Sequence, residues 1–272
     1  MAGGEAVKGV APLSVSVVLP TYNERDNVTV LIPEIEEAFA GIPLEIVVAD
    51  DSSPDGTGDA VQALNARFGN VRLVTRPRKE GLGAAIHHGL DEATHDVLIT
   101  SDADKSFQAT DMLRLYRKIE EGYDLVVGSR HSQGSRYDAT SLDIKMKYAV
   151  SRMGNRGLGM ITGLAIHDFS ANFRAIRRRV WCLLAVNETT NSILVEMILK
   201  AAYGGARVIE IPVSFGERLH GESKLSLTRE APRFMVKLCK YVAMYRFTGY
   251  RLPRARALQA TEENPGGVRR TS

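Results

Sequence analysis

Two aspartates one residue apart, Asp102 and Asp104, are the residues whose types and spacing most directly suggest chemistry. They follow an apolar run with β character at residues 97–101. A strand ending in Asp-x-Asp can hold a divalent cation against a diphosphate, because Mg²⁺ and Mn²⁺ favour carboxylate oxygens and Mg²⁺ commonly uses one or two carboxylates plus substrate phosphates. Alone, the motif is more often a solvated acidic turn. Which of these two interpretations is correct depends on the strands and helices that surround the motif.

Apolar runs alternate with amphipathic helical patterns through the first half of the chain. Residues 14–20, 44–49, 71–75 and 96–101 have the composition of buried strands. This alternation predicts βαβ units, and therefore an α/β fold with a single Rossmann-like, mainly parallel sheet flanked by helices. Ligands of such sheets bind beyond the carboxyl ends of the strands.

Three of these strand ends are polar: Tyr22-Asn23-Glu24, Asp50-Asp51 and Asp102-Ala103-Asp104. Because carboxyl ends of parallel strands meet at one edge, we expect these side chains to converge there. That convergence favours a ligand site over a solvated turn.

The second half of the chain is less regular. A polar, Gly- and Ser-containing stretch at residues 131–144 predicts a mobile loop. Helices are predicted at residues 110–121, 145–161 and 192–203, and strands at 125–129, 172–176 and 208–212.

Length and composition define four regions. We expect a flexible leader at residues 1–13, one α/β domain at 14–224, a basic amphipathic helical segment at 225–252 and a disordered tail at 253–272. The net charge of +3 over 272 residues is too balanced to indicate a nucleic-acid partner.

Targeting signals are absent from the sequence. It has no signal-peptide pattern and no apolar run of about 18 residues. Cys182 and Cys239 have neither metal-ligand nor disulfide spacing, which favours a reducing compartment. These features predict a cytoplasmic protein.

The segment 225–252 carries basic and apolar faces. Arg233, Lys237 and Lys240 share one helical face, and a basic amphipathic helix can lie on an anionic membrane. A helix that packs its apolar face on the domain has the same pattern. The sequence leaves peripheral membrane contact and simple packing equally open.

Other chemistries fit the residues less well. The motif Gly81-Leu82-Gly83 matches a dinucleotide fingerprint only in part and lies outside the first βα turn. A phosphatase using Asp-x-Asp as nucleophile remains conceivable, but no stabilising Lys/Ser set is evident. A serine nucleophile lacks its G-x-S-x-G turn.

Several ordered motifs together closely resemble dolichol-phosphate mannosyltransferases, which are inverting family 2 glycosyltransferases with a GT-A fold. The resemblance runs from about residue 15 to residue 234. The motifs are residues 20–24 (PTYNE), 50–57 (DDSSPDGT), 81–83 (GLG), 102–104 (DAD), 128–130 (GSR), 168–174 (DFSANFR) and 218–224 (RLHGESK).

The resemblance implies roles for individual residues. Asp102, Asp104 and Ser106 would bind Mg²⁺ or Mn²⁺, with Asp104 and Arg130 serving the catalytic step. The donor, a nucleotide-diphosphate sugar, would contact Pro20, Tyr22, Glu24, Val48, Asp50, Asp102, Ala103, Asp104, Arg130, Arg218 and Lys224. The acceptor phosphate would contact Lys147, Ser151 and Arg174.

The need for a general base depends on the acceptor. A phosphate monoester is mostly ionised near neutrality and needs little help, whereas a sugar hydroxyl requires a carboxylate. Asp168 is then the leading candidate and Glu196 the second, although both can equally be structural.

Two departures from the family affect the substrates. The family usually has His and Pro after Asp-x-Asp, where this chain has residues 106–109 (SFQA), and an aromatic- and Gln-containing segment is replaced at 191–195. We expect a metal-dependent transferase that moves a hexose, mannose from GDP-mannose, to a polyprenyl phosphate at a membrane or beside a membrane-anchored partner. A soluble small-molecule acceptor with a GDP- or UDP-sugar donor is the alternative, followed by a non-catalytic sugar-nucleotide-binding protein.

Overall fold

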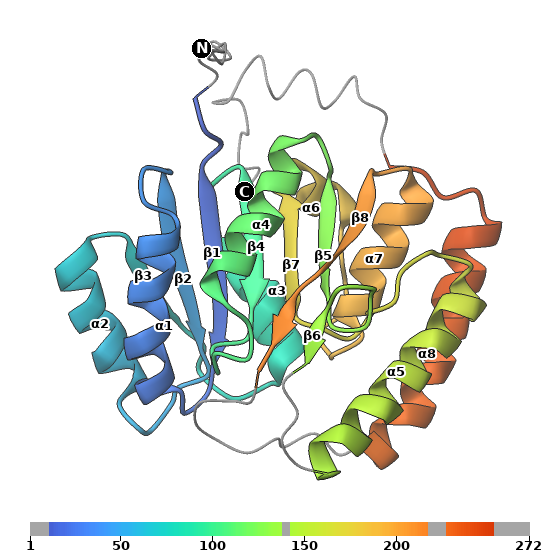
Figure 1. Cartoon of the computed structure of the whole chain (residues 1–272), viewed down its shortest axis with the longest axis horizontal. Helices are drawn as coiled ribbons and strands as arrows, with labels where there is room; N and C mark the ends of the chain where they lie inside the picture. Colours follow the sequence, from blue (N-terminus) through green and yellow to red (C-terminus); the bar gives the residue numbers. More distant parts are fainter. Residues whose placement is uncertain (1–10, 138–141, 217–226, 253–272) are drawn as a thin grey trace, which may run out of the picture.

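The structure, a computed structural model, describes residues 11–137, 142–216 and 227–252 and is built on a seven-stranded sheet (Figure 1). The strand order is β3-β2-β1-β4-β7-β5-β8. All neighbours are parallel except β7, which runs antiparallel to both β4 and β5. The strands are β1 (Val15–Thr21), β2 (Leu44–Asp50), β3 (Val71–Thr75), β4 (Val97–Ser101), β5 (Leu125–Ser129), β7 (Phe173–Arg177) and β8 (Val208–Pro212), and β6 (Arg136–Tyr137) pairs with β9 (Ser214–Phe215) beside the sheet.

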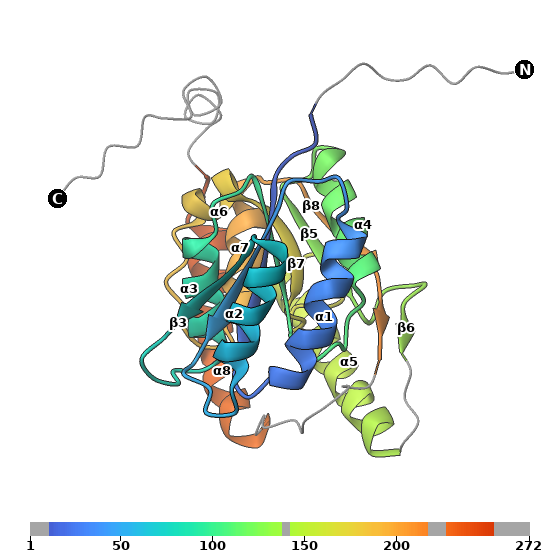
Figure 2. The ribbon, with the colours of Figure 1, turned by 90° about the vertical axis from the view of Figure 1, so that its left-hand side faces the viewer.

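Helices cover both faces of the sheet (Figure 2). One face packs on α1, α2 and α4, and the other on α3, α6 and α7, with α5 and α8 outside that layer. The helices are α1 (Arg25–Ala38), α2 (Thr57–Phe68), α3 (Leu82–Glu92), α4 (Ala109–Glu120), α5 (Leu142–Thr162), α6 (Arg178–Leu184), α7 (Ile193–Gly204) and α8 (Leu227–Phe247).

The apolar runs become strands because both of their faces are covered. All seven residues of β1 are buried, as its nearly unbroken β-branched sequence requires. The predicted α/β fold with a mainly parallel sheet is confirmed, and the strands at 71–75, 125–129 and 208–212 have the predicted bounds.

Three elements differ from the predictions. The strand expected at residues 172–176 enters the sheet antiparallel, and α6 follows it directly. The stretch 131–144, predicted as a loop, contains β6 and the start of α5; residues 138–141 lie outside the described part. The strand β6 and the helix α6 were missed because elements of two and seven residues leave little periodic signal in the sequence.

The helix α8 belongs to the same core as the sheet. It packs on α7, and Leu238, Val242 and Tyr245 are buried there. On the basic face of α8, Lys237 Nζ donates to both carboxylate oxygens of Glu188 at 2.9 Å, and the side chain of Arg233 lies outside the described part of the chain. Among the described residues, no helix combines the length and apolarity needed to cross a membrane.

A glycine sets how closely α3 approaches the loop before α7. A Cβ on Gly83 would overlap the carbonyl group of Thr190, which is rigid backbone rather than a movable side chain. Gly58 occupies the equivalent second position of α2 but would meet only Leu73 Cδ2, at 3.4 Å. The glycine motif at 81–83 therefore has a packing reason.

We expect Gly83→Ala to lower the free energy of unfolding by about 1–3 kcal/mol, because overpacking forces the backbone to shift. The matched variant Gly58→Ala should be neutral or stabilising by up to about 1 kcal/mol, since alanine is the better helix former. Chemical denaturation of both variants measures the difference. Equal stabilities would contradict the packing role of Gly83.

Candidate active site

The carboxyl edge of the sheet holds a cleft of about 330 Å³. Its walls come from the segments that follow β1, β2, β4 and β5 and from the loop before β7. The expected convergence of polar strand ends is present. The predicted residues that line this cleft are Pro20, Tyr22, Glu24, Asp102, Ala103, Asp104, Ser106 and Arg130.

Neutral donors orient the two aspartates of the motif. Asn172 Nδ2 donates to Asp102 Oδ1 at 3.0 Å, and Thr100 Oγ1 in turn fixes Asn172 with a bond of 2.7 Å to its Oδ1. Asp104 Oδ1 accepts from the backbone N–H of Ser106 at 3.0 Å and from its hydroxyl at 2.5 Å. The carboxylates are thus held in fixed directions at the cleft wall.

This donor set suits a divalent cation. Two oriented carboxylates and a hydroxyl lie within five residues, which is the kind of hard-oxygen set that Mg²⁺ and Mn²⁺ use together with ligand phosphates. Within the described part of the chain, no cluster of three or more His, Cys, Asp or Glu forms a complete cage. Any ion held here would share its coordination with a ligand.

An aromatic cluster stands where the family usually has His and Pro. Phe107 is buried and stacks on Phe173 with ring centroids 4.2 Å apart, and it meets Phe215 edge-on at 5.0 Å. Both Phe107 and Phe215 line the cleft. The departure at residues 106–109 therefore makes one wall of the cleft more apolar.

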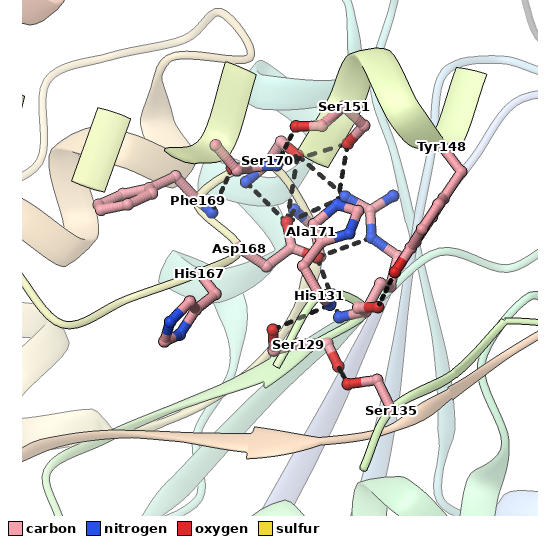
Figure 3. Close-up of polar contacts among 12 residues, drawn as sticks. Ser129, His131, Ser135, Tyr148, Ser151, His167, Asp168, Phe169, Ser170 and Ala171 are labelled. Carbon is pink, nitrogen blue, oxygen red and sulfur yellow. Dashed lines mark hydrogen bonds and ion pairs between the residues drawn. The ribbon is translucent and has the colours of Figure 1, made fainter. Parts of the chain in front are cut away.

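A buried ion pair fixes the basic side of the cleft (Figure 3). Asp168 is fully buried and binds Arg130 through two parallel bonds, Nε to Oδ2 at 2.7 Å and Nη2 to Oδ1 at 2.9 Å. The Arg130 backbone N–H adds a third bond at 3.1 Å. Although burial alone would raise it, the Arg130 charge and these bonds lower the pKa of Asp168 to about 2. The same pairing raises the pKa of Arg130 despite its burial.

These contacts bear on the two candidate bases. Asp168 also accepts from the backbone N–H groups of Ser170 and Ala171, and its low pKa makes it a weak proton acceptor. Glu196 is buried, pairs with Lys200 at 2.8 Å and lies in α7. Neither carboxylate lines the cleft.

Arg174 does not reach the cleft, which corrects its predicted contact with an acceptor phosphate. Its side chain is completely buried, and its guanidinium donates to three carbonyl groups, those of Phe169, Ala171 and Leu194. Desolvation lowers its pKa to about 9. Arg174 ties the loop before β7 to α7.

Two predicted donor contacts also lie beneath the site. Val48 is part of β2, and its side chain is fully buried in the hydrophobic core. Asp50 accepts from Thr21 Oγ1 and from the backbone N–H of Ser53, both at 2.8 Å, so it shapes the loop after β2. Its neighbour Asp51 lines the cleft and binds Arg76 at 2.7 Å.

Of the remaining predicted residues, only Ser151 has a described side chain, and it does not line the cleft. Ser151 Oγ bonds His131 Nε2 at 3.1 Å on the far side of the ion pair. The backbone of Lys147 lies in α5, but its side chain is outside the described part of the chain. Arg218 and Lys224 also fall outside the described residues.

Residues that the sequence did not single out complete the cleft. Lys79 lies with its Nζ 3.6 Å from the centre of the Tyr22 ring, and Asn172 and Ser170 come from the loop before β7. Lys79 could have been found, because it follows a strand ending at the same edge. Asn172 could not, because the direction of β7 was unknown.

Comparisons with known proteins agree with this architecture. Residues 16–184 match the family described as glycosyl transferase family 2. A dolichol-phosphate mannosyltransferase of Pyrococcus furiosus is 35% identical over 215 residues, 78% of this chain but only 59% of that relative. A polyprenol monophosphomannose synthase of Mycolicibacterium smegmatis is 34% identical over 217 residues, 77% of this chain and 80% of that relative.

A solved structure shares the fold. Glucosyl-3-phosphoglycerate synthase from Mycobacterium tuberculosis, in complex with Mn²⁺, UDP and glucosyl-3-phosphoglycerate, aligns with a TM-score of 0.63 at 20% identity, covering 84% of this chain and 80% of that chain. A helix-flanked sheet with Asp-x-Asp in a cleft at its carboxyl edge defines a glycosyltransferase domain of the GT-A fold. The chain belongs to glycosyl transferase family 2, as its motifs predicted.

The Arg130–Asp168 pair gives a pH-dependent prediction. The folded-state pKa of Asp168 is depressed from 3.8 to about 2, so its stabilising effect is complete above the unfolded value and is lost as the pH falls towards 2. The stability gap between the wild type and Asp168→Asn should narrow by about 2 kcal/mol over that range.

Chemical denaturation from pH 7 downward measures this gap. The variant Asp59→Asn, at an exposed position on α2, is the control for removal of one carboxylate. A constant gap for Asp168→Asn would contradict the ion-pair assignment.

Proposed function

We propose that this protein transfers a hexose, with inversion, from a nucleotide-diphosphate sugar to a polyprenyl phosphate, and that the sugar is mannose from GDP-mannose. One observation carries the proposal: Asp102, Asp104 and Arg130 line the same cleft. The sugar and the acceptor rest on the names of the relatives, which are mannosyltransferases of dolichol or polyprenol phosphate.

The cleft has the charges that departure of a nucleoside diphosphate requires. Negative charge grows on the leaving diphosphate, and preorganised cations stabilise it in the transition state. A Mg²⁺ or Mn²⁺ ion bound by Asp102, Asp104 and Ser106 would neutralise part of that charge. Arg130 supplies a guanidinium group whose orientation is fixed by its ion pair with Asp168. Tyr22 and Glu24 would contact the nucleotide, with Lys79 beside the Tyr22 ring.

The acceptor class follows from the contacts of the two candidate bases. Asp168 and Glu196 are both committed to buried ion pairs. A phosphate monoester is already ionised near neutrality, with a second pKa of about 6, and can attack the sugar carbon without a carboxylate partner. A phosphate acceptor therefore suits this site better than a sugar hydroxyl.

A lipid acceptor requires contact with a membrane, and the outer helices offer a surface for it. The helices α5 and α8 touch and lie at the end of the molecule farthest from α2 (Figure 1). Large apolar side chains are exposed on both, which is unusual for a soluble surface. They are Met146, Val150, Met153, Met160 and Ile161 on α5 and Val236, Met244 and Phe247 on α8.

Basic residues accompany this apolar surface. Lys145, Arg152 and Arg156 are exposed along one side of the α5 stripe, and Lys240 and Arg246 are exposed on α8. Apolar groups that enter the interface, flanked by cations that meet anionic headgroups, are typical of peripheral membrane helices. We assign the α5–α8 surface to a bilayer.

The metal assignment predicts that Asp102→Asn and Asp104→Asn each lower turnover at least 100-fold, because the diphosphate charge is no longer neutralised. Asp59→Asn should retain wild-type turnover. The assay is a panel of GDP- and UDP-sugars, each offered with polyprenyl phosphate and with soluble acceptors in the presence of Mg²⁺ or Mn²⁺. Full activity of both variants would exclude the metal site, and product only with soluble acceptors would favour the alternative substrate class.

The membrane assignment predicts that Met153→Glu plus Phe247→Glu lowers binding to phosphatidylglycerol vesicles at least tenfold, because two carboxylates would enter the interface. A control with the same charge change is Val30→Glu plus Ala66→Glu, at exposed positions on α1 and α2. Vesicle co-sedimentation compares the pairs. Equal losses would show that net charge alone governs binding.

A further inference from the structure

A second cavity, of about 380 Å³, lies between α5 and the turn that follows β5. The basic and polar side chains that line it are His131, Gln133, Tyr148, Arg152, Arg156 and His167. It shares no lining residue with the donor cleft. None of the residues that line it is acidic.

Two arginines give the cavity its charge. Tyr148, Arg152 and Arg156 are four residues apart on α5, so they share one helix face. Like charges at this spacing destabilise a helix unless something compensates them. Among the described residues neither arginine has a carboxylate partner, whereas most other arginines of the domain do. The two arginines therefore give the cavity a positive charge that no described carboxylate neutralises by direct pairing.

His131 contributes an imidazole side chain to the wall of the cavity. Burial, followed by the charge of Arg130 and Arg152, lowers the pKa of His131 to about 4 against the attraction of Asp168. Its Nε2 bonds Ser151 Oγ at 3.1 Å, and its buried Nδ1 has no hydrogen-bond partner among the described residues. Buried polar groups are normally paired, so this buried nitrogen of a cavity-lining residue is a polar atom that the described residues leave unsatisfied.

The loop that forms the opposite wall of the cavity is held in place by an acidic residue that bonds to the loop itself. His167 Nδ1 bonds Glu210 Oε2 at 2.7 Å, and Glu210 Oε1 accepts the backbone N–H groups of His167 and Asp168. Glu210 is thus used to hold this loop. The negative charge of Glu210 offsets part of the positive potential in the cavity, but the two arginines together carry one more unit of charge than Glu210 does.

The Arg130–Asp168 pair forms the partition between cavity and cleft. Arg130 lines the cleft, the next residue His131 lines the cavity, and Asp168 is flanked by His167 of the cavity and contacts Ser170 of the cleft (Figure 3). A group in the cavity would lie one layer of side chains from the proposed reaction centre.

We propose that this cavity is a second anion site that binds a phosphate monoester, with Arg152 and Arg156 as its charged contacts. Arginine is suited to phosphate because its planar donors meet two oxygens at once. The phosphate has two sources: the headgroup of a lipid phosphate whose chain lies along the apolar stripe of α5, or a soluble phosphorylated molecule. The site stands apart from the Asp-x-Asp cleft, so it does not require the proposed transfer reaction.

Isothermal titration of the full chain with inorganic phosphate tests the site, in a buffer free of phosphate and sulfate. Wild type should bind one phosphate, and Arg152→Gln plus Arg156→Gln should weaken binding at least tenfold. The control, Arg67→Gln plus Arg117→Gln, removes two exposed arginines from α2 and α4 and should bind like wild type. No saturable binding by wild type, or equal weakening in both pairs, overturns the proposal.

A measurement on the wild type covers the case in which the double variant fails to fold. Phosphate should shift the histidine side-chain NMR signals of His131 and His167, but not that of His95, whose ring is bound to the carbonyl of Val15 near the opposite edge of the sheet. Shifts absent from His131 and His167 also overturn the site. Asp102→Asn should keep the phosphate response while losing turnover, which separates this inference from the proposed function.

Two further titrations distinguish the sources. Vesicles with phosphatidic acid, a monoester, are compared with vesicles of phosphatidylglycerol, a diester, and with glycerol 3-phosphate in solution. A preference for phosphatidic acid that disappears in Arg152→Gln plus Arg156→Gln identifies a lipid headgroup, and binding of glycerol 3-phosphate without that preference identifies a soluble ligand. Equal binding of both vesicle types together with no binding of either soluble phosphate leaves only charge attraction and contradicts the site.

Discussion

The rest of the site depends on the buried pair between Arg130 and Asp168. Asp168 joins the end of β5, the loop before β7 and, through Ser170 and Asn155, the helix α5. Two parallel bonds offset the cost of burying both charges, and losing one partner of such a pair typically costs about 3–5 kcal/mol. The pair lies between the cleft, which Arg130 lines, and the cavity, which the neighbouring residues His131 and His167 line. Its geometry therefore sets both the direction of the cleft's guanidinium and the shape of the cavity behind it.

The division of labour between the carboxylates follows from this constraint. Asp102 accepts from Asn172 and Asp104 from Ser106 at the cleft wall, whereas Asp168 binds the guanidinium of Arg130 and Glu196 binds the ammonium group of Lys200. The Arg130 charge lowers the pKa of Asp168. The carboxylates that line the cleft and those that hold neighbouring elements together are thus different residues.

The sequence predicted the parallel part of the sheet and the polar edge, because buried strands have distinctive composition and their carboxyl ends must meet. It could not predict that β7 runs antiparallel between β4 and β5, since an apolar pattern carries no direction. Asn172 was missed for that reason, and Arg174 was assigned to a phosphate because an arginine in a motif usually binds a ligand. Only the packed structure shows that its guanidinium donates to three carbonyl groups. Arg218 and Lys224 remain predictions.

The contact between Lys237 and Glu188 links distant parts of the molecule. Glu188 also accepts from Tyr241 of α8 and from Thr190, and the Thr190 carbonyl lies where α3 comes closest, at Gly83. Leu82, beside that glycine, lines the donor cleft. A continuous chain of contacts therefore runs from the outer helix to the rim of the cleft. A change in the position of α8 would act on Glu188 and, through Thr190 and Gly83, on the first turn of α3.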